Sequence, residues 1–278
     1  MDMNTTIVFK PHPLLLPLIN MIMVKDVLPW KDTSRKVYSY PPTPEHCIFL
    51  YLNSPVRAKK PGEPEFTRRS ACVVVGPQVT TVDLELSQDH RAVMIGFQPG
   101  GLYRFLGLPM TELFDDGFDG FDILDKDIIN LIDELREIKQ PEKINVKVQT
   151  YLLKKLQKVR ELLPFDKAIG RLQKAGDNYP IGDVAWDACL SIRQFERKCH
   201  ERLGMSPKLY SRIARFSKAY RMFEANQHLT WTQISYSCGY FDQMHLIRDF
   251  KEFTGVTPKL MSRKLASNGL KFQAPLHI

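Results

Sequence analysis

Side chains that can bind nucleic acid bases recur at matched positions in the last third of the chain. Arg193 and Arg197 lie in one segment, and Gln243 and Arg248 lie in a second segment further along. Arginine can donate two hydrogen bonds to guanine, and glutamine can pair with adenine in the same bidentate way. In a single segment, such residues would more often form a solvated helix face. Their repetition in a second segment favours base recognition.

The two segments are copies of one helix-turn-helix pattern. The first unit runs from Ile181 to Cys199, and the second runs from Trp231 to Phe250. Equivalent residues lie 50 apart before the turn and 51 apart after it: Ala185 and Ser235, Cys189 and Gly239, then Phe195 and Leu246, Arg197 and Arg248, Gly204 and Gly255, Pro207 and Pro258. The turn of the second unit is therefore one residue longer. A duplicated unit of short helix, turn and long helix indicates two copies of one DNA-reading module.

Each unit predicts a short support helix followed by a longer recognition helix. In the first unit these are Ile181–Ala188 and Ser191–Leu203, with Ser191 as the N-cap and Gly204 at the end. In the second unit the recognition helix is Phe241–Phe253, capped by Asp242, and its support helix carries Gln233, Ile234 and Ser235. Apolar residues four apart, such as Phe195 and Cys199, face the core. The residues predicted to face outward and bind DNA are Ser191, Arg193, Gln194, Glu196, Arg197, His200, Gln243, Met244, His245 and Arg248.

A helix from Pro207 to Phe223 is predicted to join the two units. Proline suits the first position of a helix. About 17 residues at roughly 1.5 Å each give a length of about 26 Å, whereas successive major grooves on one face of DNA lie roughly 34 Å apart. With a recognition helix on either side, this helix could place both on one face of a duplex. Its basic residues are predicted to contact backbone phosphate: Arg212, Arg215, Lys218 and Arg221.

The net charge of +8 lies entirely in the duplicated part. Up to Leu163 the chain has 21 Lys and Arg residues against 21 Asp and Glu residues, and from Pro164 onward it has 18 against 10. A neutral domain followed by a basic one suits a sensor with a DNA-binding domain, because phosphate neutralisation supplies much of the affinity for DNA. A basic protein whose charge only keeps it dispersed is the alternative.

The first 163 residues predict a mixed domain of strands and helices. Apolar runs between turn residues predict strands at Cys47–Leu52, Ala71–Val75, Val79–Leu86 and Arg91–Phe97. Helices are predicted at Leu102–Leu106, at Lys126–Ile138 and at Asn145–Leu163. In the second of these helices, Ile128, Ile129, Ile132 and Leu135 are expected to be buried. The apolar stripe of the third, which includes Val148 and Leu152, packs on its own domain or pairs with a second subunit.

The expected fold class is α+β, with an N-terminal domain of mixed β-sheet and helix followed by an all-α domain. The all-α domain holds the two helix-turn-helix units, joined by the long helix. Pro164 ends the preceding helix, so the predicted domains are 1–163 and 164–264. The second domain is predicted to open with a short amphipathic helix, Phe165–Ala175, which ends before the turn Gly176–Pro180. No helical or strand pattern is found past Ser262. Residues 265–278 are predicted to be a tail without a regular pattern.

Other features exclude several kinds of site. The five cysteines, which have no zinc-ligand spacing, are expected to be buried or half-buried thiols of a cytoplasmic protein: Cys47, Cys72, Cys189, Cys199 and Cys238. The apolar run Leu14–Val24 is too short to span a bilayer and lacks a cleavage site, so we expect a buried segment and no membrane contact. The acidic stretch between Glu112 and Glu137 lacks the ligand spacing of a metal loop. We therefore expect no metal and no cofactor.

The C-terminal hundred residues resemble the AraC/XylS-type transcription regulators. The matching residues are Ala185, Ser191 and Arg197, the segment Gly204–Tyr210, the segment Cys238–Tyr240, Asp242, the segment Arg248–Lys251 and the segment Thr254–Pro258. The resemblance implies two units that bind promoter DNA, and activation of transcription through contact with RNA polymerase. The chain departs from the family pattern at Cys189, Cys199, Ser235 and Met261–Arg263.

The N-terminal part carries a weaker resemblance. Phe97–Tyr103 is similar to the Pro-Gly-Gly segment of a sensor-like domain that precedes some of these DNA-binding domains. The resemblance implies a role in effector binding or in dimerisation, so a small-molecule effector and a homodimer are both open. Tyr103 and Arg104 either line a pocket or, as we favour, belong to a helix that packs on the sheet.

Two other classes of function are less consistent with the sequence: an enzyme fused to a DNA-binding domain, and an interaction protein without DNA contact. An enzyme fused to a DNA-binding domain, for example one of DNA repair, needs a nucleophile or metal set, and the available residues His12, His46, His90, Cys47 and Cys72 form no recognisable constellation. An interaction protein without DNA contact would not need the paired arginines. The sequence therefore favours a non-enzymatic, sequence-specific transcription regulator, an activator that reads two adjacent major-groove segments of double-stranded DNA.

Overall fold

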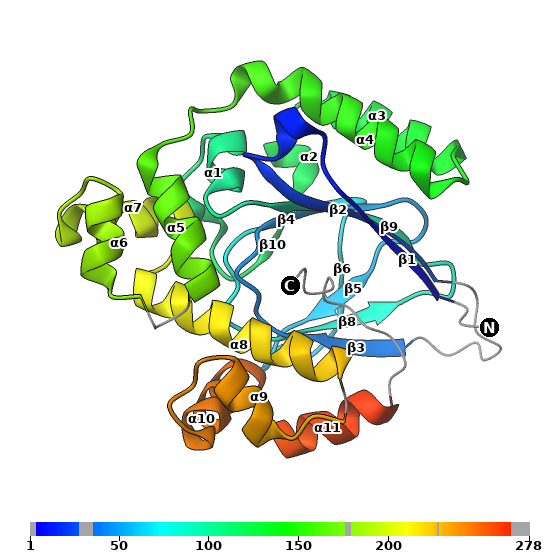
Figure 1. Cartoon of the computed structure of the whole chain (residues 1–278). Helices are drawn as coiled ribbons and strands as arrows, with labels where there is room; N and C mark the ends of the chain where they lie inside the picture. Colours follow the sequence, from blue (N-terminus) through cyan, green and yellow to red (C-terminus); the bar gives the residue numbers. More distant parts are fainter. Residues whose placement is uncertain (1–3, 28–35, 176–178, 227, 268–278) are drawn as a thin grey trace.

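The structure, a computed structural model, describes residues 4–27, 36–175, 179–226 and 228–267 (Figure 1). A β-rich N-terminal part precedes a helical C-terminal part, which confirms the predicted α+β class. The turn predicted around 176–178 and the tail beyond Ser267 lie outside the described residues. Of the helices described, none is both long and apolar enough to cross a membrane.

Within the described chain, ten strands form two antiparallel sheets. The larger sheet has the order β1-β2-β9-β4-β7-β10 and the smaller one the order β3-β8-β5-β6. The strands are β1 (Asn4–Phe9), β2 (Ile19–Val27), β3 (Lys36–Tyr40), β4 (Cys47–Tyr51), β5 (Arg57–Lys59), β6 (Thr67–Arg68), β7 (Cys72–Val75), β8 (Val82–Leu86), β9 (Arg91–Phe97) and β10 (Gly117–Asp119). The four predicted strands correspond to β4, β7, β8 and β9. The apolar run Leu14–Val24 enters β2 at Ile19 and is buried there as expected, whereas Leu14 at its start is 65% exposed.

Alternating residues of the larger sheet face two different cores. In β4, Ile48 and Leu50 belong to the main core, whereas Phe49 and Tyr51 face the smaller sheet. Side chains of a strand alternate between the two faces of its sheet, which explains this division. Helices α3 (Asp127–Glu137) and α4 (Pro141–Lys155) cover the main-core face (Figure 1). The two short helices α1 (Gly101–Leu106) and α2 (Gly120–Ile123) complete the N-terminal part.

The helix predicted from Asn145 to Leu163 is wrong in its second half. Helix α4 ends at Lys155, and a single 3-10 turn follows it. The backbone N–H of Arg160 donates to the Arg104 carbonyl at 3.1 Å, and the Arg104 Nε donates back to the Arg160 carbonyl at 3.0 Å. These tertiary hydrogen bonds hold the chain outside a helix, and helical periodicity does not reveal them.

Burial within this helical layer corrects the expectation for Ile129 and decides between the two alternatives for the stripe of α4. Ile129 is 44% exposed, while Leu131 is buried in its place. Ile128, Leu131, Ile132 and Leu135 have the spacing of one helix face, which Ile129 does not share. On α4, Val148 is fully buried in the core of its own domain. The stripe of α4 is therefore occupied within the chain and does not offer a surface to a second subunit.

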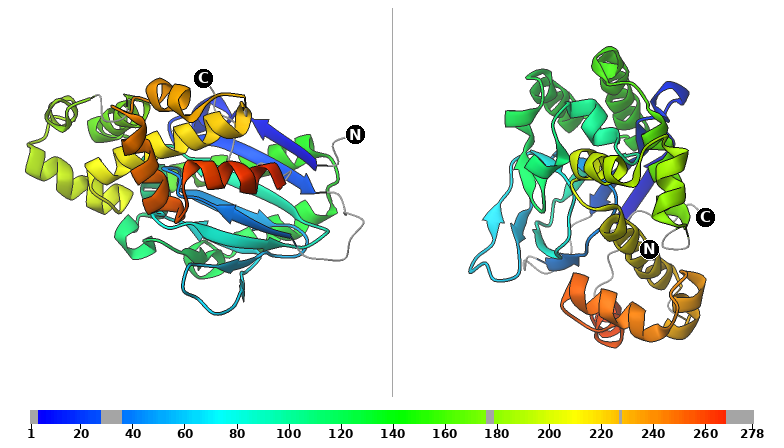
Figure 2. Two further views of the ribbon diagram at one scale, coloured as in Figure 1. Left: turned by 90° about the horizontal axis from the view of Figure 1, so that it is seen from below. Right: turned by 90° about the vertical axis from the view of Figure 1, so that its left-hand side faces the viewer.

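The C-terminal part consists of helices around a second core. They are α5 (Pro164–Ala175), α6 (Ile181–Asp187), α7 (Ile192–Leu203), α8 (Pro207–Ala225), α9 (Trp231–Ser237), α10 (Gln243–Thr254) and α11 (Pro258–Ser267). The sequence predicted all of them except α11, where it expected no element past Ser262. Helix α8 lies between α5–α7 on one side and α9–α11 on another (Figures 1 and 2). The buried residues of α5 belong to this second core, not to the first.

The turn of the first unit contains a strained residue. Cys189 adopts a left-handed conformation with φ of 56°, at the position where the second unit has Gly239 with φ of 78°. A residue with a β-carbon pays about 1–2 kcal/mol in this region. The Cys189 side chain is exposed, against the expectation of a buried or half-buried thiol, so no packing compensates for the strain. The turn geometry, which is shared by both units, imposes this conformation.

Substitution Cys189→Gly should therefore stabilise the protein. We expect its free energy of unfolding in urea to rise by about 0.5–1 kcal/mol, because the gain from relieved strain exceeds the added entropy of the unfolded chain. Gly239→Ala is the matched control and should lower the same quantity. A Cys189→Gly variant that is less stable than the parent protein would contradict this account of the turn.

Candidate nucleic-acid interface

The recognition helices α7 and α10 have buried inner faces and exposed polar outer faces. Phe195 of α7 and both Leu246 and Phe250 of α10 are fully buried, as is Cys199. All ten residues that the sequence predicted for DNA contact are exposed. This arrangement leaves their side chains accessible, and their contact with DNA stays a prediction.

Both recognition helices begin at the predicted caps. The Ser191 Oγ accepts from the Gln194 backbone N–H at 3.3 Å, and the Gln194 Oε1 accepts from the Ser191 backbone N–H at 3.0 Å, which forms a capping box. In α10, the Asp242 Oδ1 accepts from the His245 backbone N–H at 2.8 Å. The predicted base contacts of Ser191 and Gln194 therefore compete with a helix cap that these two side chains already form.

Two of the predicted phosphate contacts, Arg212 and Arg215, have protein partners. The Arg212 Nη2 lies 2.8 Å from the Asp249 Oδ1, and the Arg215 Nη2 lies 3.2 Å from the Asp249 Oδ2. Asp249 lies on α10 and is 4% exposed, so these pairs hold the second recognition helix against α8. Lys218 is the exposed member of the predicted set. Phosphate contact by all three stays a prediction.

For Arg221 the predicted phosphate contact is wrong. Its Nη2 lies 2.6 Å from the Glu45 Oε2, and both side chains are largely buried between α8 and the N-terminal part. Burial alone would lower the pKa of Arg221, but the Glu45 carboxylate raises it. The helical pattern puts Arg221 on a polar face of α8, and only the tertiary structure reveals that the N-terminal part covers that face.

Contacts at the C-terminal ends of both recognition helices also join them to the N-terminal part. The Tyr103 hydroxyl lies 2.5 Å from the Glu201 Oε1 of α7. Gly204, which ends α7, packs so tightly that a β-carbon there would lie 2.3 Å from the Pro77 Cγ. The Thr81 Oγ1 donates to the Phe253 carbonyl of α10 at 2.7 Å. The outer faces, where the DNA-contact candidates lie, remain exposed.

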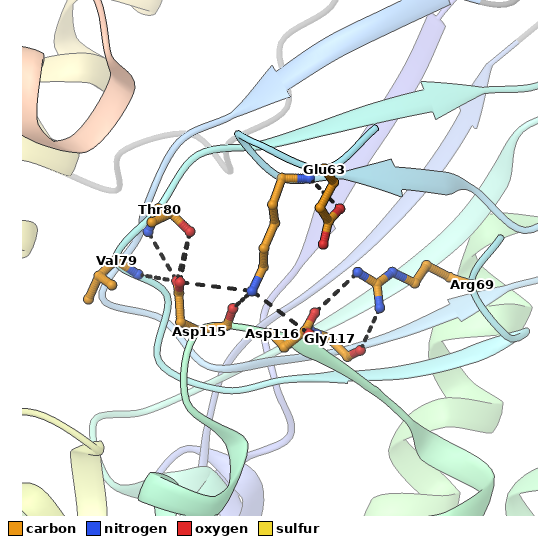
Figure 3. A network of polar contacts seen from close by, with 8 residues as sticks. Glu63, Arg69, Val79, Thr80, Asp115, Asp116 and Gly117 are labelled. Atoms are coloured by element: carbon orange, nitrogen blue, oxygen red, sulfur yellow. Dashed lines mark hydrogen bonds and ion pairs between the residues drawn. The ribbon is translucent and has the colours of Figure 1, made fainter. Parts of the chain in front are cut away.

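The segment Pro77–Thr81 makes two of these contacts, and Asp115 holds it in place (Figure 3). The Asp115 carboxylate accepts from the Val79 backbone N–H at 2.9 Å, and from the Thr80 backbone N–H at 3.1 Å. It also accepts from the Thr80 hydroxyl at 2.8 Å. Asp115 has φ of 54°, a left-handed conformation that aspartate tolerates better than most residues. A single carboxylate thus fixes the backbone that touches both recognition helices.

A cavity lies between the two sheets. Its wall is mostly apolar and includes Met23, Phe49, Val56, Ala58, Val73, Leu84 and Met94. Charged and polar side chains also line it, among them Lys25, Arg69, Gln78, His90 and Asp116. Burial lowers the pKa of Lys25 to about 8, and the nearby Glu224 of α8 opposes that shift. Burial and Lys25 lower the pKa of His90 to about 3. An apolar wall with a few buried polar groups is typical of a small-molecule site.

The residues weighed for an enzyme do not form an activated nucleophile. Burial raises the pKa of the Cys72 thiol to about 12, and burial also raises the pKa of the Cys47 thiol. A nucleophilic cysteine needs the opposite shift. Burial lowers the pKa of His46 to about 4. Over the described ranges, no group of three or more His, Cys, Asp or Glu side chains could hold a metal ion.

Family comparisons match both parts of the chain. Residues 7–119 match a domain of unknown function (DUF6597), and residues 184–264 match a helix-turn-helix domain. The C-terminal part is an AraC-type helix-turn-helix domain. This domain serves DNA binding and transcription regulation, as the family resemblance implied. No curated protein matches the chain.

Solved structures of similar fold include ToxT from Vibrio cholerae. The apo form of a lysine-to-alanine ToxT variant is 15% identical, with 87% of this chain and 96% of that chain covered and a TM-score of 0.50. Wild-type ToxT with a bound unsaturated fatty acid is 13% identical, with 91% and 97% covered and a TM-score of 0.49. The DNA-binding domain of AdpA, solved with a target DNA, is 19% identical, with 40% and 100% covered and a TM-score of 0.37. At these identities the likeness to the apo ToxT variant shows the fold alone.

The sequence reasoning missed the polar groups of the cavity. Lys25 lies in β2, directly after the buried residues Met23 and Val24, and is itself 4% exposed. The sequence did contain a signal for this group, namely a lysine within a buried apolar strand. Burial of an ammonium group is costly, so such a lysine indicates a specific role. Tyr103 and Arg104 do not line this cavity, in agreement with the favoured reading of a helix packed on the sheet.

The ion pair of Arg221 with Glu45 should be a main determinant of stability. Arg221→Ala leaves Glu45 buried without its partner, and we expect the free energy of unfolding in urea to fall by about 3–5 kcal/mol. The exposed pair of Lys147 with Glu134 is the control, since Lys147→Ala should cost less than about 1 kcal/mol. Equal losses in the two variants would contradict a buried contact between α8 and the N-terminal part.

Proposed function

We propose that the protein is a sequence-specific transcription regulator that reads two adjacent major-groove segments and acts as an activator. The observation that carries this proposal is the pair of exposed polar faces at equivalent positions of α7 and α10. Recognition helices of this motif contact base edges through residues near their N-terminal ends. Activation through RNA polymerase is supported by the family resemblance.

The geometry of α8 supports simultaneous binding by the two units. The helix has 19 residues, which at roughly 1.5 Å per residue gives about 28 Å. Successive major grooves on one face lie roughly 34 Å apart. The first unit directly precedes α8, and the second packs along it through Arg212, Arg215 and Phe216. Helix α8 therefore holds the two recognition helices at a fixed separation. The ion pairs of Asp249 with Arg212 and Arg215 keep α10 fixed on this helix.

Removal of one base-reading arginine from each unit tests the proposal. Arg197→Ala and Arg248→Ala should each weaken binding to a selected target duplex by about 1–3 kcal/mol, since each loses a contact to a base edge. Fluorescence anisotropy with labelled duplex measures this at fixed salt. Lys143→Ala, an exposed change in the N-terminal part, should leave affinity unchanged. If both arginine variants bound the target as tightly as the parent protein, the assigned recognition faces would be wrong.

We also propose that the cavity binds an apolar effector with one acidic group. Its wall is apolar, and the buried ammonium group of Lys25 can pair with a carboxylate there. ToxT has been solved with an unsaturated fatty acid, a molecule of this chemistry. The chemistry of the lining residues thus defines the charge and the polarity of the effector.

Two routes connect such a ligand to the DNA-binding units. An acidic group would compete with Glu224 of α8 for Lys25, because Glu224 acts electrostatically on that ammonium group. Gln78 lines the cavity and belongs to the segment Pro77–Thr81, which contacts both recognition helices. Occupation of the cavity would therefore act on α8 and on the C-terminal ends of α7 and α10 together.

The charge of Lys25 can be tested with paired ligands. Calorimetric titration of straight-chain unsaturated acids and of the corresponding alcohols should give tighter binding for the acids. Lys25→Met should weaken the acids by about tenfold or more, the expected loss of a hydrogen bond to a charged group, and leave the alcohols unchanged. Equal weakening of acids and alcohols would contradict the proposed ion pair. Absence of binding by both series would contradict the effector class.

A further inference from the structure

The turn of the second unit contains one residue that has no counterpart in the first. In the first turn, the backbone N–H of Leu190 donates to the Ala185 carbonyl at 3.0 Å. In the second turn, the backbone N–H of Tyr240 donates to the Ser235 carbonyl at the same distance of 3.0 Å. The two turns are thus equivalent up to these residues. The N-cap follows Leu190 directly in the first unit, whereas Phe241 precedes the N-cap in the second.

The additional residue is turned away from the protein. Leu190 and Tyr240 both pack toward the core, and the Tyr240 ring lies 4.3 Å from the Arg215 guanidinium carbon. Because Tyr240 fills the core position, Phe241 is left 86% exposed. Its ring meets the edge of the His245 ring, with a centroid separation of 6.1 Å. Phe241 therefore contributes little to the core of its own unit.

A second exposed apolar side chain follows Phe241 at the start of α10. Met244 is 57% exposed and follows Phe241 by three residues at the start of α10. The residue equivalent to Met244 in the first unit is Arg193, which is charged. The start of the second recognition helix thus presents an apolar pair in a basic domain, beside Arg248, the arginine proposed to contact a base.

Only one base edge offers a matching apolar group in the major groove, the 5-methyl group of thymine. We infer that Phe241, together with Met244, contacts thymine methyl groups and makes the second half-site specific for thymine. The inference rests on the proposed function, because it requires that α10 enters the major groove. It gives the two units different preferences, because Phe241 has no counterpart in the first unit.

Replacement of thymine by deoxyuridine tests this directly, because the two bases differ only in the methyl group. The duplex selected by the full-length protein is resynthesised with single deoxyuridines across the second half-site. At one or two positions, we expect the Kd of the parent protein to rise by about three- to tenfold. Phe241→Ala should show a similar loss on the thymine duplex and no further loss on the deoxyuridine duplex.

Tyr236→Ala provides the matched control, since Tyr236 is also an exposed aromatic residue but lies on the support helix α9. This variant should keep the full sensitivity to deoxyuridine. Equal binding of both duplexes by the parent protein would overturn the inference, and so would an undiminished deoxyuridine effect in Phe241→Ala, since the methyl contact would then lie elsewhere. A parent protein that selects no sequence at all would refute the proposed function as well, and the selection step reports this separately.

Discussion

Helix α8 has to be buried on several sides at once, and much of the molecule follows from this constraint. The Phe216 ring of α8 packs against the rings of Phe250 and Phe253 of the second recognition helix, with centroid separations of 4.9 and 5.2 Å. Its other faces meet the first unit and the N-terminal part. A cation on a covered face of this helix cannot stay unpaired without a large desolvation cost, so Arg221 pairs with Glu45, and Arg212 pairs with Asp249. The helix that joins the two units is therefore also the helix that binds them to the N-terminal part.

Local chemistry explains which parts of the fold the sequence could predict. Caps, periodicity and the repeat itself identified helices α5 to α10, because each signal lies within a few residues of the element that it defines. The short strands β5, β6 and β10 were missed, since their residues carry no apolar alternation and exist as strands only through their partners. The overlong helix past Lys155 failed for the same reason, because its end is decided by hydrogen bonds between Arg104 and Arg160.

In the candidate site, too, the sequence predicted the features set by local pattern and missed those set by tertiary contacts. Sequence comparison of the two units located the exposed faces of α7 and α10, since burial alternates with the helical period on either copy. The same reasoning could not separate Lys218, which is exposed, from Arg221, which the N-terminal part covers. Nor could it reveal the cavity, whose lining residues come from separate strands of two sheets. The segment Pro77–Thr81, which Asp115 holds, was also beyond prediction from the sequence. It links the cavity residue Gln78 to the ends of both recognition helices.

The central claim is that two units of one chain read adjacent major grooves. Selection of bound sequences from a random duplex pool by the full-length protein, with sequencing of the retained pool, tests it most directly. The account predicts a motif of two different short half-sites with centres about one helical turn apart, roughly 10–10.5 base pairs. A single short motif, or retention that depends on salt but not on sequence, would contradict the claim.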